Sequence, residues 1–295
     1  MENKIIDGKA IAAELKKEIA QEVAQIIDKN QKAPHLAAVL VGNDPASKTY
    51  VSSKEKACKA VGITSSVYQL SENTTEKELI DVIQFLNNDD EIDGFIVQLP
   101  LPKHINPDRV IETIHPAKDV DGFTPTNVGR MQLGMPCYVP ATPFGIVELL
   151  KRSNVEVEGK HVVVLGRSNI VGTPISILLS RKAEGANATV TLCHSRSNDL
   201  ISFTKQADIL IAAIGQKEFV KADMVKKGVV IIDVGIHRVA DSSNEKGYKI
   251  VGDVDYEPVS KMASKITPVP GGVGPMTIVS LLYNTLLASK KAIYK

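Results

Sequence analysis

The sequence predicts an α/β protein with two domains, the second of them doubly wound. Three observations carry this prediction. At 295 residues the chain is long for a single hydrophobic core. Short runs of β-branched residues alternate with helical patterns almost throughout, which is typical of parallel sheets with crossover helices. Between residues 115 and 145, five prolines and four glycines break any long element, so we expect this stretch to be a loop-rich crossing between the domains.

Composition excludes several classes of protein. The hydrophobic share of 43% and the charged share of 23% are those of an ordinary globular protein. A formal net charge of +1 gives no electrostatic reason to expect nucleic acid or a membrane as a partner. The longest apolar runs are far too short to span a bilayer, and the first nine residues lack the apolar core of a signal peptide. Three widely spaced cysteines fit neither a disulfide framework nor a paired metal-ligand motif, so we expect free thiols and a reducing, cytoplasmic location.

The first half of the chain alternates between helix and strand. Apolar residues recur at spacings of four and three through residues 11–26, which predicts one apolar stripe on a helix. Buried strands are expected at 35–42, 63–70 and 94–99. Asp44, followed directly by proline, is a suitable N-cap for the helix after the first strand.

The second half restarts the pattern and continues nearly to the end of the chain. Residues 268–275 contain three prolines and three glycines and are not expected to form regular structure. A final amphipathic helix follows, and we expect it to return to the first domain. The expected domains are therefore 1–145 joined by the helix 276–295, and 146–275. The strands of the second domain are expected at 161–165, 189–194, 207–215 and 229–236.

A glycine-bounded loop, Gly-Arg-Ser-Asn-Ile-Val-Gly, lies between the strand at 161–165 and the following helix. Backbone N–H groups at Gly166, Arg167 and Ser168, together with a helix N-terminus, are suited to hold a pyrophosphate. The loop is not the usual G-x-G-x-x-G, and a structural turn would explain one of its glycines. Its position after an apolar strand favours a Rossmann-type dinucleotide-binding domain.

The tip of the next strand indicates which dinucleotide is bound. In such domains this strand normally ends in an acid that holds the ribose 2′-hydroxyl of NAD. Here the tip carries Ser195 and Arg196 and has no acid, and Arg167 in the first loop is a second guanidinium. Hydroxyl and guanidinium groups bind a 2′-phosphate that a carboxylate would repel. A solvated loop charge is the alternative for Arg196, but the missing acid favours NADP over NAD.

One lysine lies on an apolar helical face. Tyr50, Lys54, Cys58 and Val61 are spaced four, four and three, so they stack on one side of a helix. A lysine partly shielded from water in this way is suited to proton transfer. The alternative is a lysine that only covers apolar surface with its stem.

Gln98 and two aspartates strengthen the functional interpretation. Gln98 closes the apolar strand at 94–99, and parallel sheets bind ligands at the carboxyl ends of their strands. Its amide can donate to or accept from a neighbouring amine. Asp119 and Asp121 lie in the loop-rich crossing, where either can accept hydrogen bonds from a nitrogen heterocycle. Turn and cap chemistry is their alternative role, and we expect it for one of the two.

Together these stretches resemble the bifunctional methylenetetrahydrofolate dehydrogenase/methenyltetrahydrofolate cyclohydrolase family over nearly the whole chain. The likeness rests on many motifs in the right order. They are Val41–Ser47 with Tyr50 and Lys54, Gly94–Pro102, Lys118–Gly122, Gly166–Pro174, Asp233–Ile236 and Pro268–Thr277.

The resemblance implies two domains around a cleft, one binding folate and the other NADP. In that cleft 5,10-methylenetetrahydrofolate is oxidised and its methenyl product is hydrolysed to 10-formyltetrahydrofolate. It implies that Lys54 transfers protons with Gln98 as its hydrogen-bonding partner, that Tyr50 packs against the folate rings and that Asp121 holds the pterin. It also implies a homodimer that pairs through the cofactor domains, and no metal. The implied cofactor-site residues are Gly166, Arg167, Ser168, Ser195, Ile236 and Thr277.

The chain departs from the common form of the family in a longer connection at 182–188, which we expect to shift the approach to Ser195. Two other functions stay open. A dehydrogenase of another small substrate would explain residues 160–240 but not the lysine, glutamine, tyrosine and aspartate of the first domain together. A non-catalytic folate-binding protein would carry the same residues without turnover.

Overall fold

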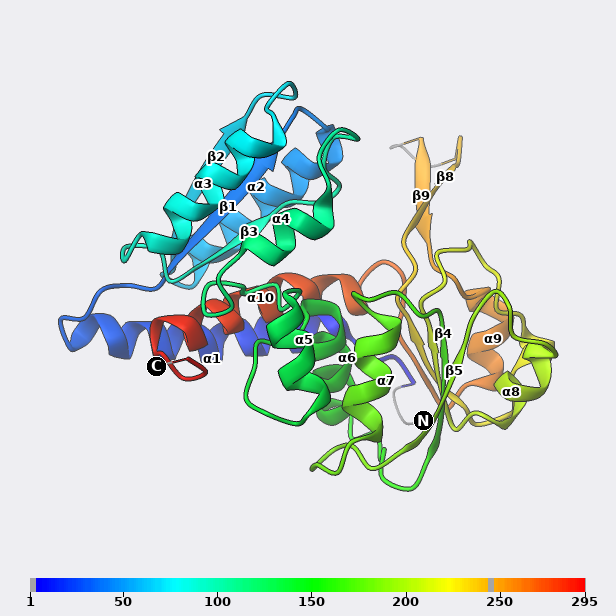
Figure 1. The fold of residues 1–295 in the computed structure, drawn as a ribbon. Coiled ribbons are helices and arrows are strands. Elements are labelled where there is room, and N and C mark those ends of the chain that lie inside the picture. The colour runs from blue at the N-terminus through cyan, green and yellow to red at the C-terminus, as the bar shows by residue number, and fades with distance from the viewer. Residues whose placement is uncertain (1–3, 244–246, 295) are drawn as a thin grey trace. The chain divides into compact units, whose positions relative to one another are not determined.

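The computed structural model describes residues 4–243 and 247–294, and its chain divides into two compact units (Figure 1). The first, named here the five-stranded unit, comprises Met1–Ala13 and Thr142–Thr277. The second, named the three-stranded unit, comprises Glu14–Ala141 and Ile278–Lys295. Both are built on parallel sheets, as the alternating pattern predicts.

The three-stranded unit has a sheet in the order β2-β1-β3, with every pairing parallel. Alternate residues of a strand face opposite sides of its sheet. Ala37, Val39 and Val41 therefore pack on one side, in a core that includes residues of α3 and α4, and α2 contacts β1 and β2. The elements are β1 (His35–Val41), α2 (Pro45–Ala60), β2 (Thr64–Leu70), α3 (Glu76–Asn88), β3 (Gly94–Val97) and α4 (Pro107–Thr113).

Side-chain caps begin all three of these helices, α4 through Asn106. Asp44 accepts a hydrogen bond from the backbone N–H of Ser47 at 2.7 Å, with Pro45 in the first helical turn, so the predicted N-cap of α2 is confirmed. Thr75 and Glu78 form a reciprocal capping box at the start of α3. Because a neighbouring residue satisfies this helix end, the sequence alone was sufficient to place the Asp44 cap.

The stretch at 115–145, where the chain passes from one unit to the other at Ala141–Thr142, is not made of loops alone. It contains α5 (Pro125–Gln132) and the start of α6 (Ala141–Arg152), and the side chains of Met131 and Tyr138 are 1% exposed. The reason is that Thr124 caps α5 and Pro125 occupies its first turn, where a proline begins a helix rather than breaking it.

The five-stranded unit has a fully parallel sheet in the order β5-β4-β6-β7-β10. Numbered along the chain, this order is 2-1-3-4-5, one of the two common doubly wound arrangements. The predicted doubly wound fold is thus confirmed, and strand order reverses between β4 and β6. The elements are β4 (His161–Leu165), α7 (Gly172–Ser180), β5 (Thr189–Cys193), α8 (Leu200–Gln206), β6 (Ile209–Ala212), η1 (Ala222–Met224), β7 (Val230–Asp233), α9 (Tyr256–Met262) and β10 (Lys265–Ile266).

The units differ from the expected domain boundaries at the start of the chain. Ile6 donates its backbone N–H to the carbonyl of Ile266, and Ile266 donates to the carbonyl of Lys4. These bonds pair the first described residues with the edge strand β10, which explains why residues 1–13 belong to the five-stranded unit. Two long helices begin in that unit and end in the other: α1 (Gly8–Asp28) and α10 (Val273–Ser289). The segment 268–275 is therefore not wholly irregular, because α10 starts within it.

The final residues of the chain pack within the three-stranded unit. Asn284 of α10 donates to the carbonyls of Val120 and Val139, at 2.8 and 3.0 Å. The hydroxyl of Tyr294 donates to Asn127 at 2.8 Å. These contacts account for the return of residues 278–295 to that unit.

A two-stranded antiparallel hairpin, β8 (His237–Ala240) and β9 (Tyr248–Val251), projects from the rest of the five-stranded unit (Figure 1). The sequence analysis did not anticipate it. The guanidinium of Arg238 lies 4.8 Å from the ring centroid of Tyr248, across the hairpin. Among the described residues neither strand pairs with any other strand.

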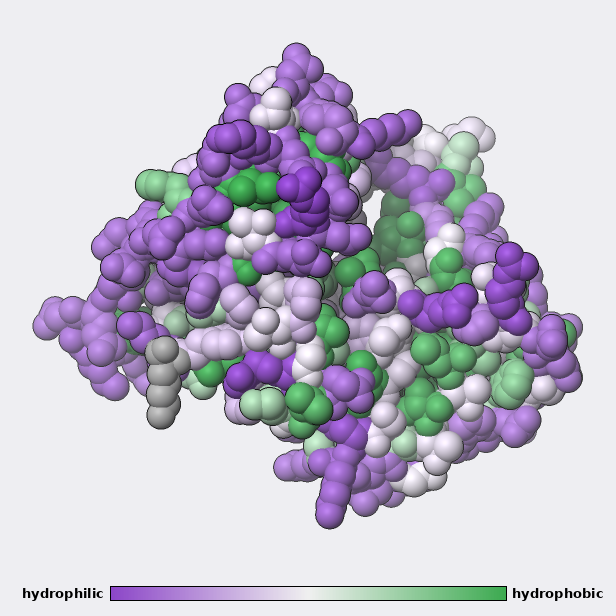
Figure 2. Space-filling model, in the orientation of Figure 1, coloured by the Kyte–Doolittle hydropathy of each residue, from purple (hydrophilic) through white to green (hydrophobic). Residues whose placement is uncertain are grey.

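The surface is largely polar on the face drawn in Figure 2, where apolar residues occur in scattered groups. Within residues 4–243 and 247–294, no helix is both long enough and apolar enough to span a lipid bilayer.

Candidate functional site

Lys54 and Gln98 meet directly in the three-stranded unit. Lys54 lies in the third turn of α2, and Gln98 follows the last residue of β3. The Nζ of Lys54 donates a hydrogen bond to Oε1 of Gln98 at 3.1 Å. Both side chains are half-buried, whereas Lys48, Lys56 and Lys59 on the same helix are exposed. The structure therefore distinguishes Lys54 from its neighbours, as the helical spacing predicts.

Gln98 is held so that its amide oxygen faces the lysine. Its backbone N–H donates to the carbonyl of Val39 at 2.8 Å, which continues the ladder between β1 and β3. Its side-chain Nε2 donates to the carbonyl of Leu99 at 2.6 Å. Because the amide nitrogen is engaged in this bond, the oxygen is the atom left for Lys54.

Asp119 and Asp121 have different roles. Asp119 is 1% exposed and accepts hydrogen bonds from the backbone of Phe123 and Thr124 and from the side chain of Asn127. It is a structural residue that closes the loop, which matches the expectation that one of the two aspartates serves turn chemistry.

Asp121 is half-buried, and its carboxylate has no hydrogen-bond partner among the described residues. Loss of water raises its pKa to about 6, and the nearby charge of Lys54 acts in the opposite direction. Asp121 is therefore the aspartate whose carboxylate feels the charge of Lys54 and has free acceptor oxygens.

Tyr50 and Cys58 flank Lys54 one turn away on either side along α2. Tyr50 is 50% exposed, so its ring is available to a flat ligand. Cys58 is buried, and burial raises the pKa of its thiol to about 12, which leaves it unreactive. The lysine thus lies between an open aromatic ring and an inert core thiol.

The glycine loop of the five-stranded unit lies where strand order reverses. A Cβ on Gly166 would lie 2.1 Å from the carbonyl oxygen of Ala213, at the end of β6. A Cβ on Gly172 would lie 1.9 Å from the carbonyl oxygen of Gly166. Ser168 Oγ accepts from the backbone N–H groups of Val171 and Gly172, at 3.2 and 3.4 Å. Both glycines are therefore required by close backbone approach, which is the feature that a pyrophosphate-binding loop needs.

A pocket of about 270 Å³ opens beside this loop, at the carboxyl ends of β4, β5 and β6. Gly166, Arg167, Ser168 and Ser195 line it, whereas Arg196 does not. Its mouth carries hydroxyl and guanidinium groups and no acid, so the pocket fits the phosphorylated dinucleotide better than NAD. The remaining lining residues, most of which sequence reasoning missed, are Leu165, Cys193, His194, Leu200, Ala213, Ile214, Gln216 and Phe219.

The longer connection at 182–188 does not lie near Ser195. It enters β5 at its amino end, and β5 pairs with β4 in unbroken register from Thr189 to Cys193. Ser195 follows the opposite, carboxyl end of that strand. The expectation that this connection shifts the approach to Ser195 is therefore wrong, because a regular ladder separates the two.

Ile236 and Thr277 lie apart from the pocket lining but close to one another through Gly274. A Cβ on Gly274 would lie 3.7 Å from Cδ1 of Ile236, and Thr277 Oγ1 donates to the Gly274 carbonyl at 2.8 Å. Ile236 is 54% exposed, which leaves a large apolar side chain open to a ligand.

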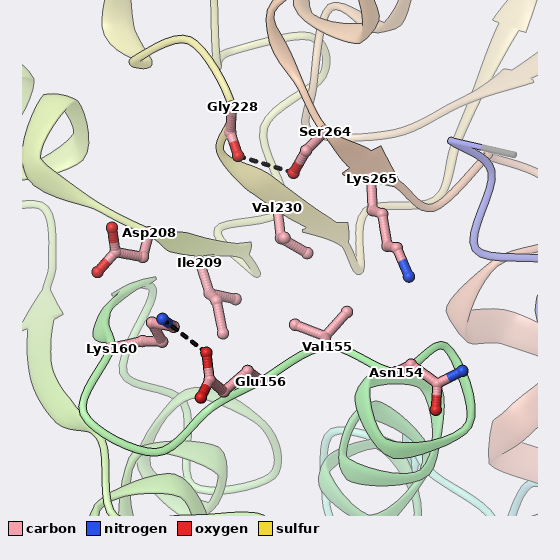
Figure 3. A pocket seen from close by; sticks show the side chains of 10 residues that line it. All are labelled: Asn154, Val155, Glu156, Lys160, Asp208, Ile209, Gly228, Val230, Ser264 and Lys265. Carbon is pink, nitrogen blue, oxygen red and sulfur yellow. Dashed lines mark hydrogen bonds and ion pairs between the residues drawn. The ribbon is translucent and has the colours of Figure 1, made fainter. Parts of the chain in front are cut away.

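A second pocket, of about 350 Å³, lies at the amino ends of β4, β6, β7 and β10 (Figure 3). Its charged groups are engaged: Lys160 is bound to Glu156 at 2.8 Å, Asp208 to Lys226 at 2.6 Å, and Lys265 donates to the carbonyl of Ser153. Parallel sheets bind nucleotides at the opposite edge, so this pocket is not a candidate for the cofactor. Within the part of the chain that the structure describes, no cluster of three or more His, Cys, Asp or Glu side chains is arranged to hold a metal ion.

Two family models match the chain. Residues 6–121 match the model of the tetrahydrofolate dehydrogenase/cyclohydrolase catalytic domain, and residues 140–293 match that of the NAD(P)-binding domain of the same family. The chain belongs to the tetrahydrofolate dehydrogenase/cyclohydrolase family. A protein named bifunctional protein FolD from Bacteroides thetaiotaomicron is 60% identical over 291 residues, which are 99% of each chain.

Solved structures agree with this membership of the tetrahydrofolate dehydrogenase/cyclohydrolase family. The bifunctional enzyme FolD of Campylobacter jejuni has a TM-score of 0.92 and 49% identity, covering 98% of this chain and 99% of its own. The methylenetetrahydrofolate dehydrogenase-cyclohydrolase of Trypanosoma brucei, solved with NADP and an inhibitor, has a TM-score of 0.91 and 39% identity, covering 99% and 98%.

Proposed function

We propose that Lys54, Gln98 and Asp121 act on the folate in an enzyme that carries out two successive reactions. The enzyme oxidises 5,10-methylenetetrahydrofolate to 5,10-methenyltetrahydrofolate with NADP, and then hydrolyses this product to 10-formyltetrahydrofolate. The observation that carries the residue assignment is the hydrogen bond from Lys54 to Gln98 at the carboxyl end of β3.

Hydrolysis is the step that needs a positioned acid and base. Water adds to the carbon of the methenyl cation and loses a proton. The ring opens when its departing nitrogen gains a proton, and the remaining hydroxyl proton leaves to solvent as the formyl C=O forms. A single amine within reach of both sites can accept the first proton and return it to the nitrogen. Lys54 is the amine suited to this role, because the Gln98 oxygen fixes its direction.

Asp121 and Tyr50 hold the folate. The free carboxylate oxygens of Asp121 accept hydrogen bonds from the N–H groups of the pterin, which replace the water lost on burial. The exposed ring of Tyr50 offers a flat apolar face to the folate rings. Lys54, one turn from Tyr50, then lies beside the one-carbon unit.

NADP, when bound, accepts the hydride that leaves the folate carbon. Arg167 and Ser168 offer backbone N–H groups to its pyrophosphate, whereas the N–H of Gly166 donates to the Cys193 carbonyl at 2.8 Å. Because Gly166 has no Cβ, the loop can pack closely on the Ala213 carbonyl at the end of β6. Ser195 and Arg167, which line one pocket, bind the 2′-phosphate. Ile236 and Thr277, grouped around Gly274, complete the cofactor site.

We further propose a homodimer that pairs through the five-stranded unit. Two-stranded hairpins are marginally stable on their own in water, and β8–β9 has free edges among the described residues. Pairing with a second copy would cover them. Light scattering that gives the mass of a monomer at micromolar concentration would contradict this proposal. Cys58, Cys137 and Cys193 are buried and form no disulfide, which supports a reducing, cytoplasmic location.

The test of the proposed function is Lys54→Gln, with the exposed Lys56→Gln as a matched control on the same helix. Glutamine keeps much of the length and hydrogen bonding of lysine but cannot carry a proton at neutral pH. We expect the cyclohydrolase rate to fall by about 10²–10⁴-fold, the usual contribution of general acid–base catalysis. The dehydrogenase rate should survive in part, because hydride transfer depends mainly on positioning.

Both activities are followed by the absorbance of methenyltetrahydrofolate, which accumulates in the Lys54→Gln protein if the assignment is correct. The Lys56→Gln protein should hydrolyse it at the original rate. Unchanged hydrolysis by folded Lys54→Gln would mean that this lysine only covers apolar surface. Absence of both activities from the unmodified protein would favour a non-catalytic folate-binding protein.

A further inference from the structure

A buried carboxylate of the five-stranded unit holds the wall of the nucleotide pocket. Asp253 is 0% exposed, and its Oδ2 accepts the backbone N–H groups of Ile214 and Gly215, at 2.8 and 3.0 Å. These two residues follow β6, and Ile214 lines the pocket beside the glycine loop. The position of this part of the wall therefore depends on one side chain from a distant part of the sequence.

The other oxygen of Asp253 is held by His237. The Nε2 of His237 lies 2.8 Å from Oδ1 of Asp253. His237 directly follows Ile236, the exposed apolar residue of the proposed cofactor site. The carboxylate of Asp253 thus forms hydrogen bonds to two segments of that site: the backbone of Ile214–Gly215, and His237, which follows Ile236.

Several contacts leave this carboxylate little freedom to move. Asp233 accepts the backbone N–H groups of Asp253 and Val254, at 2.9 and 3.0 Å. A Cβ on Gly235 would lie 2.4 Å from Oδ1 of Asp253, and one on Gly252 would lie 1.8 Å from Oδ2 of Asp233. The chain thus has no room for side chains at these two glycines, which keeps the two aspartates in place.

A displacement of Ile214–Gly215 would also displace the proposed pyrophosphate-binding loop at Gly166. Gly166 packs so closely on the end of β6 that its Cβ would meet the Ala213 oxygen at 2.1 Å and the Ile214 nitrogen at 3.5 Å. A shift of Ile214 would therefore displace the backbone that faces the dinucleotide. Interiors packed this tightly transmit strain rather than absorb it.

We propose that the His237–Asp253 pair is a positioning element for the dehydrogenase reaction. By fixing Ile214–Gly215 relative to Ile236, it keeps the nucleotide pocket in the shape that binds NADP and aligns it for hydride transfer. Both residues belong to the five-stranded unit, whereas the residues proposed for hydrolysis belong to the three-stranded unit, so we expect the hydrolysis step not to depend on the pair. This inference rests on the proposed NADP site.

The test is His237→Ala, with His237→Gln as the conservative variant that retains a side-chain N–H. His161→Ala is the matched control, because His161 also bonds a side chain, Thr191 Oγ1 at 2.8 Å, but lies at the amino ends of the strands. NADP binding is measured by titration calorimetry on the full chain. Dehydrogenase and cyclohydrolase rates are measured separately, the latter on methenyltetrahydrofolate without NADP.

We expect His237→Ala to raise the Kd for NADP about tenfold, equivalent to about 1.4 kcal/mol, with a stoichiometry near one per chain. The dehydrogenase kcat/KM for NADP should fall at least as much, and the hydrolysis rate should stay unchanged. His237→Gln should restore most of the affinity, and His161→Ala should bind as the unmodified protein does.

The proposal is overturned if His237→Ala binds NADP normally, or if its hydrolysis rate falls in parallel with its dehydrogenase rate. A Kd as weak in His237→Gln as in His237→Ala would also overturn it. Failure of the unmodified protein to bind NADP is a different outcome, since it would remove the proposed cofactor site itself.

Discussion

Lys54 Nζ and Gln98 Oε1 lie 3.1 Å apart although the two residues are 44 positions apart in the sequence. One side chain comes from the middle of a helix and the other from the end of a strand. A lysine free in solvent samples many rotamers, and this bond selects one direction for its amine. The hydrogen bond to Gln98 thus orients the amine of Lys54, so that it can transfer protons at one defined position.

Removal of the acceptor should therefore impair the lysine without removing it. We predict that Gln98→Ala lowers the cyclohydrolase rate by about 10- to 100-fold, because a hydrogen bond to a charged group is worth about 1.5–3 kcal/mol. Gln84→Ala, at an exposed position on α3, is the control and should have no effect. Initial rates of methenyltetrahydrofolate hydrolysis measure this, and equal rates for both variants would refute the positioning role of Gln98.

The ionised carboxylate of Asp121 should lower the free energy of unfolding at neutral pH. Its pKa is raised from 3.8 to about 6, chiefly by burial, so ionisation opposes folding. The cost is present in full above about pH 6 and disappears as the pH falls towards 3.8. We predict that Asp121→Asn raises the free energy of unfolding by about 1–3 kcal/mol at pH 7.5 and by clearly less at pH 4.5.

Urea unfolding at the two pH values measures this difference. The exposed Asp90→Asn controls for the loss of one negative charge, and its effect should stay within about 0.5 kcal/mol. Asp121→Asn should also lose activity, because a group kept at a cost to stability is expected to serve function. A variant no more stable than the unmodified protein at pH 7.5 would argue against a desolvated carboxylate.

The choice of cofactor should depend on the tip of β5. We predict that Ser195→Asp weakens NADP about tenfold or more through charge repulsion and affects NAD much less. Ser242→Asp makes the same change of net charge at an exposed position between β8 and β9 and should leave both affinities unchanged. Dehydrogenase assays with each cofactor decide the matter. Equal use of NADP and NAD by the unmodified protein would contradict the argument.

The helix glycines Gly172 and Gly129 should respond in opposite ways to alanine. The Cβ of Gly172→Ala would collide with the Gly166 carbonyl oxygen at 1.9 Å, so we predict a distorted loop and loss of NADP binding. Gly129, in α5, has nothing within 4 Å of its Cβ position. Gly129→Ala should leave binding intact and stabilise the protein by up to about 1 kcal/mol, since alanine favours helix. Titration calorimetry measures NADP binding, and thermal unfolding measures stability. Tight NADP binding by Gly172→Ala would argue against the close packing of Gly172 on the Gly166 carbonyl.

Local physics explains how much of the structure was predictable. The strands at His35–Val41 and His161–Leu165, the Asp44 cap and the stripe that includes Lys54 all depend on residues near one another in the chain. Hydrophobic periodicity and helix capping involve residues only a few positions apart, so the spacing of residue types in the sequence predicts them directly. Gln98 could be assigned for a related reason, because the end of a parallel strand is where side chains of several segments meet.

Other features depend on contacts between distant segments. Nothing local separates Asp119 from Asp121; Asn127 and the backbone of Thr124 engage the first, and desolvation beside Lys54 marks the second. The start of the chain joins the five-stranded unit because β10 offers it an edge, 260 or so positions away along the sequence.

The sequence by itself determined the alternation of elements, the glycine loop, the absence of an acid after β5 and the candidate lysine. Each of these features depends on the types of residues that lie close together in the chain. Only the tertiary structure decided which groups meet: Lys54 with Gln98, and Asp253 with His237 and the Ile214–Gly215 wall. The physical reason is that hydrogen bonds and desolvation act over a few ångströms in space. Chain folding alone brings residues that far apart in sequence within that range.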